Sequence, residues 1–379
     1  MQVNKSRLLQ VVLAVVKAIV CVACVGVTVW GAHTMLIINP AAGQANATDT
    51  SDYLVMDRYD KYIINSFSEA LEGVMSISRV YWLSDSDLVA PEPDPACYGE
   101  TSNPKDLEPV IAKAQNLLDG QELVFSTDVE LAPDSVIRYY YDPSILAITW
   151  QVVIDNSIYS MSEVKISDGS QLRRFLSDGR YAAGTRYLCT EMADTVNAVV
   201  AVNGDYYDVR HIGPTVYNRQ LMRMEGYRMD SCMIDGDGDL NFVRAGEIVT
   251  RSEMEQYVQR EDIRFSLAFG PVIVDNGELV DFKSPYCVGE VHQPNDRAAL
   301  CQKDKLHYLV VIANGPYPYE KHLLSQFAKR VQEMGVHKAY NIDGGRSGVL
   351  VINNKKVNEV HERELSDIIY FATAISSED

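Results

Sequence analysis

Three short segments gather asparagine, aspartate, glycine and arginine at the ends of predicted strands. They are residues 203–207 (NGDYY), 295–299 (NDRAA) and 341–347 (NIDGGRS). Carboxylates and guanidinium groups can bind and cleave a polar ligand, and glycine lets such a ligand approach the backbone. Each segment alone is also typical of an ordinary turn, so the prediction of a site depends on all three together.

Two further motifs complete an ordered series that resembles the phosphodiester glycosidase family. Residues 269–280 (FGPVIVDNGELV) lie between the first two segments, and residues 362–371 (ERELSDIIYF) follow the third. The resemblance covers about residues 159–374. The family includes the lysosomal uncovering enzyme, N-acetylglucosamine-1-phosphodiester alpha-N-acetylglucosaminidase, and bacterial exported proteins. The resemblance implies a hydrolase that separates a sugar from a phosphodiester at the anomeric position.

The chemistry of that reaction suggests a role for each segment. Cleavage passes through an oxocarbenium-like state, so a carboxylate near C1 stabilises positive charge or activates water, and Asp205 and Asp343 are the predicted catalytic residues. The departing phosphate needs cations more than a strong acid, and Arg297 and Arg346 are predicted to hold it. The predicted substrate-binding residues are Asn203, Gly204, Tyr206, Asp296, Arg297, Asn341, Gly344, Gly345, Arg346 and Ser347.

The two aspartates are predicted to share one pocket. Asp205 follows a predicted buried strand at residues 198–202, and Asp343 follows another at residues 338–342. Parallel neighbouring strands deliver such residues to the same edge of a sheet. We therefore expect the pair to divide the work at one sugar and to give the activity an acidic limb.

Three motifs depart from the family pattern and support a second hypothesis. Arg346 replaces the third glycine of the typical Asn-Leu-Asp-Gly-Gly-Gly-Ser, and residues 296–301 lose the proline, hydroxyl and glycine of Pro-Arg-Thr-Ala-Ile-Gly. Residues 314–316 (NGP) stand where Asp-Gly-Arg is usual. The alternative function is a catalytically weakened protein that binds a cell wall or a sugar phosphate on the same fold.

Several candidate residues also have structural interpretations. The Asp343 side chain can bond the Gly344–Gly345 backbone in a turn, and Arg297 can form an ion pair with Asp296 or a neighbouring residue. The alternating acids of residues 235–239 suggest calcium, but an acidic hairpin explains them better because a strand follows at once. No metal site and no cofactor are therefore expected, although a divalent cation would fit the chemistry.

The remaining signals predict a mixed α/β (α+β) domain at residues 121–379, in which a single mixed sheet is flanked by helices. A stalk or linker is predicted at residues 48–120. β-Branched and aromatic runs between turns indicate strands, and apolar spacing of 3.6 residues indicates helices. The expected strands are 137–141, 145–154, 160–166, 198–202, 306–313, 338–342, 349–352 and 368–374, and the expected helices are 170–176, 186–196 and 319–334.

An uncharged segment near the N-terminus predicts a membrane anchor. Residues 18–38 contain no Asp, Glu, Lys or Arg, and 21 helical residues rise about 31 Å, the thickness of a bilayer core. Three basic residues precede this segment and no acidic residue occurs before Asp49, which favours a cytoplasmic N-terminus. Residues 1–47 are thus predicted to form a cytoplasmic basic tip and a single-pass signal anchor. The alternative is secretion after cleavage near Ala47.

The charge of the chain narrows the classes of molecule that it can bind. Three of 34 basic residues and none of 52 acidic residues precede Asp49, so the part predicted to lie outside the cell has a net charge of −21. This negative charge excludes nucleic acid as a partner. A glycosyl phosphodiester or phosphate-containing glycopolymer is the expected partner, and it must meet a local basic pocket.

Five cysteines follow the predicted membrane span, without a CxxC motif, and their pairing stays open: Cys97, Cys189, Cys232, Cys287 and Cys301.

Overall fold

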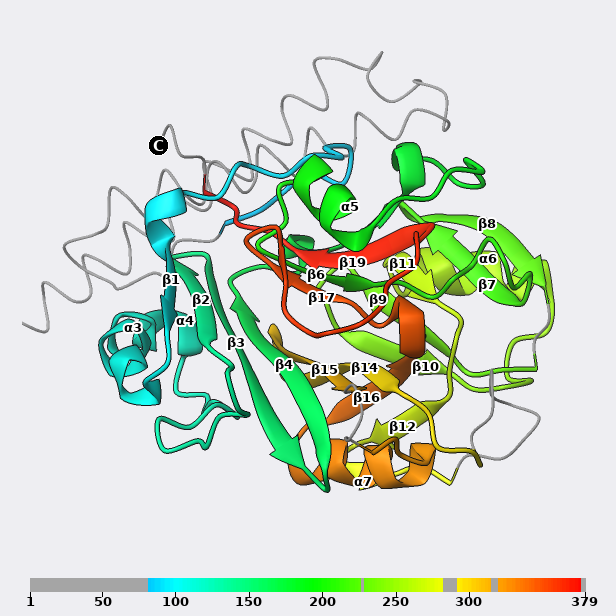
Figure 1. The fold of residues 1–379 in the computed structure, drawn as a ribbon. Helices are drawn as coiled ribbons and strands as arrows, with labels where there is room; N and C mark the ends of the chain where they lie inside the picture. Colours follow the sequence, from blue (N-terminus) through cyan, green and yellow to red (C-terminus); the bar gives the residue numbers. More distant parts are fainter. Residues whose placement is uncertain (1–80, 226–227, 282–291, 315–319, 376–379) are drawn as a thin grey trace, which may run out of the picture. The chain divides into compact units, whose positions relative to one another are not determined.

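The computed structural model describes residues 81–225, 228–281, 292–314 and 320–375 (Figure 1). All of them belong to one compact unit. The predicted membrane span and residues 48–80 of the predicted stalk lie outside the described residues, so both stay predictions. Within the described ranges, no helix is long and apolar enough to cross a membrane.

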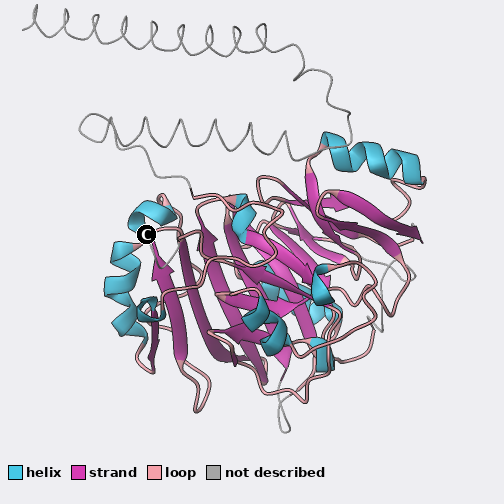
Figure 2. Cartoon of the chain, turned by 90° about the horizontal axis from the view of Figure 1, so that it is seen from above, coloured by secondary structure: helices cyan, strands magenta, loops and turns pink. Residues whose placement is uncertain are grey.

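Two antiparallel sheets form the framework of this unit (Figures 1 and 2). The larger sheet has the order β1 (Tyr98–Thr101), β2 (Ile137–Asp142), β3 (Ile145–Ile154), β4 (Ser157–Ile166), β15 (His307–Asn314), β14 (Arg297–Asp304), β16 (Lys338–Ile342), β12 (Val272–Asp275) and β13 (Glu278–Leu279). The smaller sheet has the order β18 (Lys355–Lys356), β17 (Leu350–Ile352), β6 (Val200–Asn203), β19 (Asp367–Phe371) and β5 (Leu172–Leu176). The predicted α+β class is confirmed, whereas the predicted single mixed sheet is wrong. All the strand pairs described in these two sheets are antiparallel.

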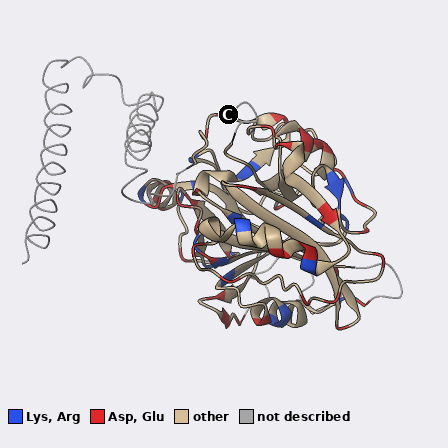
Figure 3. Ribbon diagram, turned by 90° about the vertical axis from the view of Figure 1, so that its left-hand side faces the viewer, with Lys and Arg blue, Asp and Glu red and all other residues tan. Residues whose placement is uncertain are grey.

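One continuous hydrophobic core lies between the two sheets. Val310 and Ile312 of β15 meet Val202 and Leu350 of the smaller sheet there. The intervening residue Val311 points to the opposite face and packs in a second core under helices. Because both faces of β15 are covered, its sequence is a continuous apolar run without polar alternation. Charged residues lie mainly on helices and loops (Figure 3).

Helices cover the outer faces of the sheets. The helices α3 (Glu108–Lys113), α4 (Gln115–Leu118) and α7 (Leu324–Glu333) lie against the larger sheet, and α5 (Cys189–Thr195) lies against the smaller one. The helix predicted at residues 319–334 begins later because His322 forms a β-bridge with Asn295. Gly335, with φ of 75°, adopts the left-handed conformation that commonly follows the end of a helix.

A smaller layer completes the unit beside the main core. It contains β9 (Ser231–Asp235), β10 (Leu240–Val243) and β11 (Ile263–Leu267) in one sheet, β7 (Gly213–Tyr217) and β8 (Gln220–Glu225) in another, and α6 (Arg251–Arg260). The acidic residues 235–239 connect β9 to β10, which confirms the predicted hairpin. Asn276–Gly277 connects β12 to β13, as its turn chemistry predicts.

Residues 170–176, predicted as a helix, instead end in the edge strand β5. Arg173 and Arg174 are both buried in this strand. Arg173 Nε donates to the Tyr370 hydroxyl at 2.9 Å, and Arg174 Nε donates to Asp367 Oδ2 at 2.9 Å. Because both arginines pair with residues distant in the sequence, β5 has no exposed polar face. Its sequence therefore lacks the alternation of apolar and polar residues by which a strand is predicted.

The described part of the predicted stalk, residues 81–120, is packed into the domain. Strand β1 pairs with β2 at the edge of the larger sheet, and Leu107 and Leu118 are buried in the core under α3 and α4. The stalk prediction is therefore wrong for residues 81–120, and the compact unit begins near residue 80. The turn-rich sequence of residues 81–120 does not predict this packing, because the residues that it contacts lie far along the chain.

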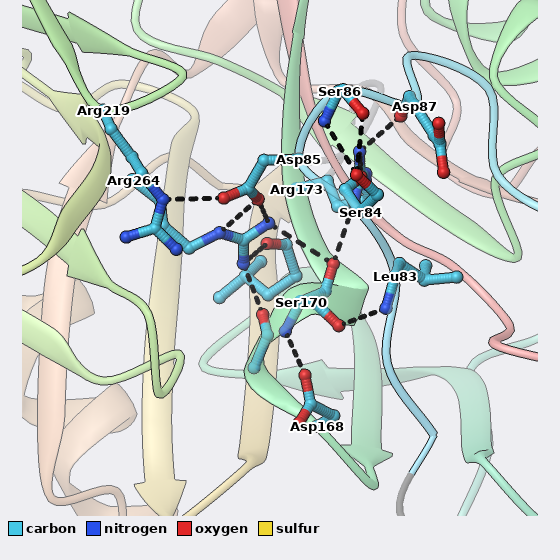
Figure 4. A network of polar contacts seen from close by, with 12 residues as sticks. Leu83, Ser84, Asp85, Ser86, Asp87, Asp168, Ser170, Arg173, Arg219 and Arg264 are labelled. Atoms are coloured by element: carbon cyan, nitrogen blue, oxygen red, sulfur yellow. Dashed lines mark hydrogen bonds and ion pairs between the residues drawn. The ribbon is translucent and has the colours of Figure 1, made fainter. Parts of the chain in front are cut away.

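Arginine side chains hold residues 83–87 against the domain (Figure 4). The Asp85 carboxylate accepts hydrogen bonds from Arg264 Nε and Arg219 Nε, both at 2.8 Å. Leu83 N donates to Ser170 Oγ at 2.8 Å. Burial opposes ionisation of Asp85, but the charges of Arg264 and Arg219 hold its pKa below the ordinary value. The ionised Asp85 thus compensates the buried guanidinium of Arg264.

Four of the five cysteines beyond the predicted span lie within the described residues. Cys97, Cys189, Cys232 and Cys301 are free thiols, and the last three are buried. Cys287 lies outside the described residues, so its pairing is not addressed.

Candidate active site

Four side chains meet where the ends of strands from the two sheets converge. This group, named the Asp343 cluster, contains Tyr206, Asp343, Ser347 and Arg363. Arg363 Nη2 donates to Asp343 Oδ2 and Arg363 Nε donates to Ser347 Oγ, both at 2.6 Å. Arg363 Nη1 donates to the Tyr206 hydroxyl at 3.3 Å, and its guanidinium carbon lies 4.2 Å from the centre of the Tyr206 ring. One guanidinium group therefore positions a carboxylate, a hydroxyl and an aromatic ring.

Segments from both sheets position the cluster. Tyr206 follows β6 of the smaller sheet, and Asp343 follows β16 of the larger sheet. Asn203 joins these two strand ends because its Nδ2 donates to the Asp343 carbonyl oxygen at 2.7 Å. Arg363 precedes β19, and its backbone N donates to the Arg346 carbonyl oxygen at 3.1 Å.

The turn after β16 depends on two glycines. Gly344 lies so close to Asp296 that a Cβ would collide with the Asp296 carbonyl group. Gly345 has φ of 58°, in the left-handed region that favours glycine. The turn then presents Ser347 to Arg363. Tyr206 also has a positive φ, 62°, which is uncommon for a residue with a side chain and occurs often at functional sites.

Asp343 is the carboxyl group that this cluster offers to a ligand. Its side chain is 14% exposed. Burial raises the pKa of Asp343 above its ordinary value, although the Ser347 hydrogen bond and the charges of Arg363 and Arg210 act in the opposite direction. Such a carboxyl group can exchange a proton closer to neutral pH than an ordinary aspartate can.

Two arginines lie over the Tyr206 ring, and the charge of a third arginine acts on Asp343. Besides Arg363, the Arg186 guanidinium carbon lies 5.9 Å from the centre of the Tyr206 ring. The charge of Arg210 acts on Asp343. A local basic pocket was expected for a phosphate-containing ligand of this acidic chain, and this is the place where arginines gather beside a predicted catalytic aspartate.

A cavity of about 480 Å³ adjoins the cluster at Arg186 and at Tyr207, the residue that follows Tyr206. It is lined by Tyr181, Ala182, Gly184, Arg186, Tyr207, Asp208, His211, Arg223 and Glu364. Arg186 thus connects the cavity to the Asp343 cluster, because it lies over the Tyr206 ring and also pairs with Asp208 at 3.0 Å.

Asp205, the other predicted catalytic residue, belongs to a different group. Arg174 Nη2 lies 2.6 Å from both Asp205 Oδ1 and Asp367 Oδ2, and these three side chains form the Arg174 cluster. Asp205 Oδ2 accepts a further hydrogen bond from Ala268 N at 2.8 Å. A Cβ at Gly204 would collide with the Asp367 carboxylate, so packing against Asp367 requires glycine at this position. The Asp205 side chain is 1% exposed in this cluster, and no hydrogen bond joins it to Asp343.

The argument that paired the two aspartates is therefore wrong. It required parallel neighbouring strands, but β6 and β16 lie in different sheets and each pairs antiparallel with its neighbours. The buried strands themselves were predicted correctly. Their sequences indicate burial on both faces, which occurs in antiparallel layers as well as in parallel sheets.

The backbone of residues 296 and 297 lies beside Gly344, but the side chains point to other partners. Arg297 donates from Nη2 to the Gln293 carbonyl oxygen at 2.8 Å and from Nε to the His322 carbonyl oxygen at 3.2 Å. Asp296 pairs with Lys321 at 3.2 Å. Arg297 thus supports two loops, and the charge of Asp296 acts on its guanidinium group.

Two further predicted ligands also make contacts outside the Asp343 cluster. Arg346 is exposed and donates from Nε to the His361 carbonyl oxygen at 3.1 Å. Asn341 is buried and donates from Nδ2 to the Gly270 carbonyl oxygen at 2.7 Å. The prediction that Arg346 holds phosphate has no support from these contacts, because the cation beside Asp343 is Arg363.

Sequence reasoning missed Arg186, Arg210 and Arg363. Arg363 lies within the motif ERELSDIIYF that carries part of the family resemblance, so that motif contained a usable signal. Arg186 and Arg210 lie in segments without a recognisable pattern. Their approach to Tyr206 and Asp343 follows from the packing of distant loops.

No metal centre can be assigned within the described ranges. They contain no group of three or more His, Cys, Asp or Glu side chains arranged to hold a metal ion. Asp235, considered for calcium, uses Oδ1 to accept hydrogen bonds from Asp237 N and Asp239 N at 3.0 and 2.9 Å. These bonds close its own hairpin.

Comparisons with known proteins agree with the motifs. Residues 196–372 match the family model described as phosphodiester glycosidase. A solved structure of a hypothetical protein from Synechocystis has 13% identity and a TM-score of 0.51, and the match covers 64% of each chain. This chain therefore spans about two thirds of that protein, and at this identity the likeness shows the fold alone.

A second solved structure is the zebrafish N-acetylglucosamine-1-phosphodiester alpha-N-acetylglucosaminidase catalytic domain, auto-inhibited by its pro-peptide. It has 16% identity and a TM-score of 0.47, and the match covers 68% of this chain and 93% of that one. No curated protein sequence matches this chain. The resemblance predicted from the motifs is confirmed by the family model over residues 196–372.

Proposed function

We propose that this chain, a hydrolase that carries a phosphodiester glycosidase domain over residues 196–372, cleaves a sugar-1-phosphodiester bond. The substrate is a glycosyl phosphodiester within a cell-envelope or extracellular glycopolymer. The chain acts outside the cell and is held at the membrane by residues 18–38. The products are a free sugar and a phosphomonoester.

The observation that carries this proposal is the position of Arg363. It binds Asp343 at 2.6 Å and lies over the Tyr206 ring, with Arg186 and Arg210 nearby, in a protein whose net charge is strongly negative. Arginine matches phosphate oxygens in geometry and charge. A phosphate held by Arg363 and Arg210 would place its linked sugar next to Asp343.

The reaction then requires one carboxyl group and the arginines. The bond between C1 and the bridging oxygen breaks, and the phosphate leaves with that oxygen while Arg363 and Arg210 stabilise its charge. Asp343 stabilises the positive charge that develops at C1 and accepts a proton as water adds there. Its raised pKa makes that proton transfer effective closer to neutral pH.

Release of free sugar from a panel of sugar-1-phosphodiesters tests this function on the full chain in detergent. We expect turnover of at least one member of the panel and a loss of about tenfold to hundredfold for Arg363→Ala, because charge stabilisation at the leaving group disappears. Arg346→Ala is the matched control, since Arg346 is an exposed arginine in the adjoining turn. Equal losses for both variants would contradict the role of Arg363.

A second candidate function follows from the Arg174 cluster. Because Asp205 is buried there, Asp343 is the one predicted catalytic aspartate that remains in the Asp343 cluster. A site with a single such carboxyl group is compatible with a catalytically weakened protein that binds sugar phosphates. Saturable binding of every sugar-1-phosphodiester without release of sugar from any of them would favour this alternative.

The proposed location has its own test. Protease added outside intact cells should digest residues 48–379 and leave the N-terminal part protected, because the basic residues flank the uncharged segment on its N-terminal side. Recovery of a protein that begins near residue 48 in the medium would instead support cleavage near Ala47.

A further inference from the structure

Asn203 is buried at the end of β6, beside the Asp343 cluster. It is the last residue of that strand and is 1% exposed, so its side chain has almost no surface for a ligand. Its Nδ2 donates to the Asp343 carbonyl oxygen at 2.7 Å and to the Gly204 carbonyl oxygen at 3.1 Å. Any part that Asn203 takes in the proposed reaction is therefore indirect and acts through the Asp343 backbone.

The hydrogen bond from Asn203 to Asp343 crosses from one sheet to the other. β6 pairs with β17 and β19 in the smaller sheet, and β16 pairs with β14 and β12 in the larger sheet. Both strands are thus fixed on two sides by backbone hydrogen bonds, whereas Asp343 lies one residue beyond the end of β16. Asn203 therefore ties a residue that has left its own sheet to a central strand of the other sheet.

Asp343 is consequently held at two points. Asn203 binds its backbone carbonyl oxygen, and Arg363 binds its Oδ2 at 2.6 Å. A fixed backbone restricts a short side chain such as aspartate to a few rotamers, and precise placement is what a catalytic carboxyl group needs. Without the bond from Asn203, residues 343–347 can move toward solvent, and the carboxyl group gains contact with water.

The unused oxygen of Asn203 supports this interpretation. Its Oδ1 is buried and has no hydrogen-bond partner among the described residues. A buried polar atom without a partner is unfavourable, and an apolar side chain of similar size would avoid that penalty. An aspartate would instead place an oxygen against two carbonyl oxygens, because an ionised carboxylate can only accept. The donor that Asn203 supplies to Asp343 is thus a reason for an amide at this position.

We propose that Asn203 is a positioning residue for Asp343: it fixes the Asp343 backbone so that the carboxyl group stays partly buried beside Arg363. The inference rests on the proposed function, in which Asp343 is the carboxyl group that acts at C1. It adds that a residue of the other sheet, without contact to the substrate, sets the surroundings in which Asp343 gains and loses its proton.

The acidic limb of kcat, measured on the full chain in detergent, tests this role. Burial raises the pKa of Asp343. A hydrogen bond from Ser347 and the charges of Arg363 and Arg210 act in the opposite direction. If Asn203→Ala lets Asp343 move toward solvent, the effect of burial weakens and the pKa falls toward its ordinary value. The limb should then shift to lower pH, and kcat at neutral pH should fall by about tenfold because the carboxyl group is misplaced. A purely structural role would reduce the amount of folded enzyme without moving the limb.

Asn341→Ala is the matched control. Asn341 is 2% exposed, donates from Nδ2 to a carbonyl oxygen at 2.7 Å and has an Oδ1 without a partner among the described residues. Its partner is Gly270 instead of Asp343. We expect the acidic limb of this variant at the same pH as in the wild type. Equal shifts in Asn203→Ala and Asn341→Ala would overturn the positioning role, as would an unmoved limb in a folded, active Asn203→Ala variant.

Asn203→Asp distinguishes positioning from direct binding of the substrate. This substitution keeps an acceptor oxygen and removes the donor that faces Asp343. We expect kcat to fall at least as far as in Asn203→Ala, because the new oxygen meets the Asp343 carbonyl oxygen. A folded Asn203→Asp variant with the kcat of the wild type would show that the donor is not needed and would overturn the proposal.

Hydrogen exchange separates this inference from the proposed function, because it needs no turnover. The Ser347 and Gly348 amides close the turn after Asp343 with hydrogen bonds of 3.1 and 3.2 Å. They should exchange about tenfold faster in Asn203→Ala and at the wild-type rate in Asn341→Ala. This result without turnover of any phosphodiester would support the positioning of Asp343 and remove the hydrolase activity. Exchange at the wild-type rate in Asn203→Ala would overturn the positioning.

Thermal unfolding shows whether each variant is folded. Asn203→Ser, whose hydroxyl is too short to reach the Asp343 carbonyl oxygen, replaces Asn203→Ala if the latter does not fold. If neither variant folds while Asn341→Ala does, Asn203 is required for the stability of the whole domain and the positioning role is overturned.

Discussion

Arginine and aspartate pair at 2.6 Å in two regions of this molecule, and their surroundings differ. In the Arg174 cluster, the Arg174, Asp205 and Asp367 side chains are at most 1% exposed. In the Asp343 cluster, Arg363 is 33% exposed and Asp343 is 14% exposed. The same pair of residue types therefore occurs once inside the protein and once at its surface.

The comparison teaches that exposure, not residue type, separates a structural pair from a pair that can belong to a candidate site. Buried charges lose their hydration and must be compensated by fixed partners, so the Arg174 cluster has no capacity left for a ligand. The Asp343 cluster keeps contact with solvent and adjoins a cavity. Its groups can exchange water for substrate.

Removal of Arg174, the central cation of the Arg174 cluster, should have the largest effect. Arg174→Leu leaves Asp205 and Asp367 buried without their shared cation, and we expect the free energy of unfolding to fall by about 3–5 kcal/mol. Urea denaturation followed by tryptophan fluorescence measures the change. Arg363→Leu is the matched control and should cost less because its pair is partly exposed. Similar losses in both variants would break the comparison.

Removal of the charge at Asp343 should change activity more than stability. Asp343→Asn keeps the size of the side chain, and we expect kcat for a sugar-1-phosphodiester to fall by about a hundredfold while the free energy of unfolding changes little. Steady-state kinetics and denaturation of the same sample check both statements. A folded Asp343→Asn variant with full activity would show that Asp343 is not the catalytic carboxyl group.

The pH dependence of stability should report on the buried cluster. Burial raises the pKa of Asp367 from 3.8 to about 6, with Arg174 opposing and Asp205 adding to the shift. The folded state then binds the proton more tightly than the unfolded state, so the contribution of Asp367 is present below about pH 4 and is lost as the pH rises through about 6.

The measurement is the unfolding free energy of the wild type relative to Asp367→Asn between pH 4 and pH 7. We expect this difference to become less favourable to the wild type as the pH rises, because the variant has no proton to lose at that position. A flat difference would show that Asp367 does not titrate separately. Asp343, whose pKa is also raised, should instead appear as the acidic limb of kcat.

The smallest effect is expected at Arg346. Its side chain is exposed and contacts the His361 carbonyl oxygen, so Arg346→Ala should change the free energy of unfolding by less than about 0.5 kcal/mol. The KM for a phosphodiester substrate should also stay close to that of the wild type. A clear rise in KM would instead support the prediction from the sequence that Arg346 binds the phosphate group of the substrate.

The amino-acid sequence by itself determined several of the strands, two of the turns and the resemblance to a family. Apolar runs predict β3, β15 and β16, and Asn276–Gly277 predicts its hairpin, because strand burial and turn conformation depend on neighbouring residues. The ordered motifs indicate a phosphodiester glycosidase domain, and the family model matches residues 196–372. Asn203, Tyr206, Asp343 and Ser347 could likewise be selected from these motifs.

Only the tertiary structure decided which of the candidate residues act together. Arg174 and Asp367 are separated by 193 residues, and Arg363 and Tyr206 by 157. Such pairs form where strands distant in the sequence become neighbours in one sheet, as β5, β19 and β6 do, and local spacing carries no information about that pairing. For this reason the sequence could propose Asp205 and Arg346 for the site, whereas the fold buries the first with Arg174, exposes the second and places Arg363 beside Asp343.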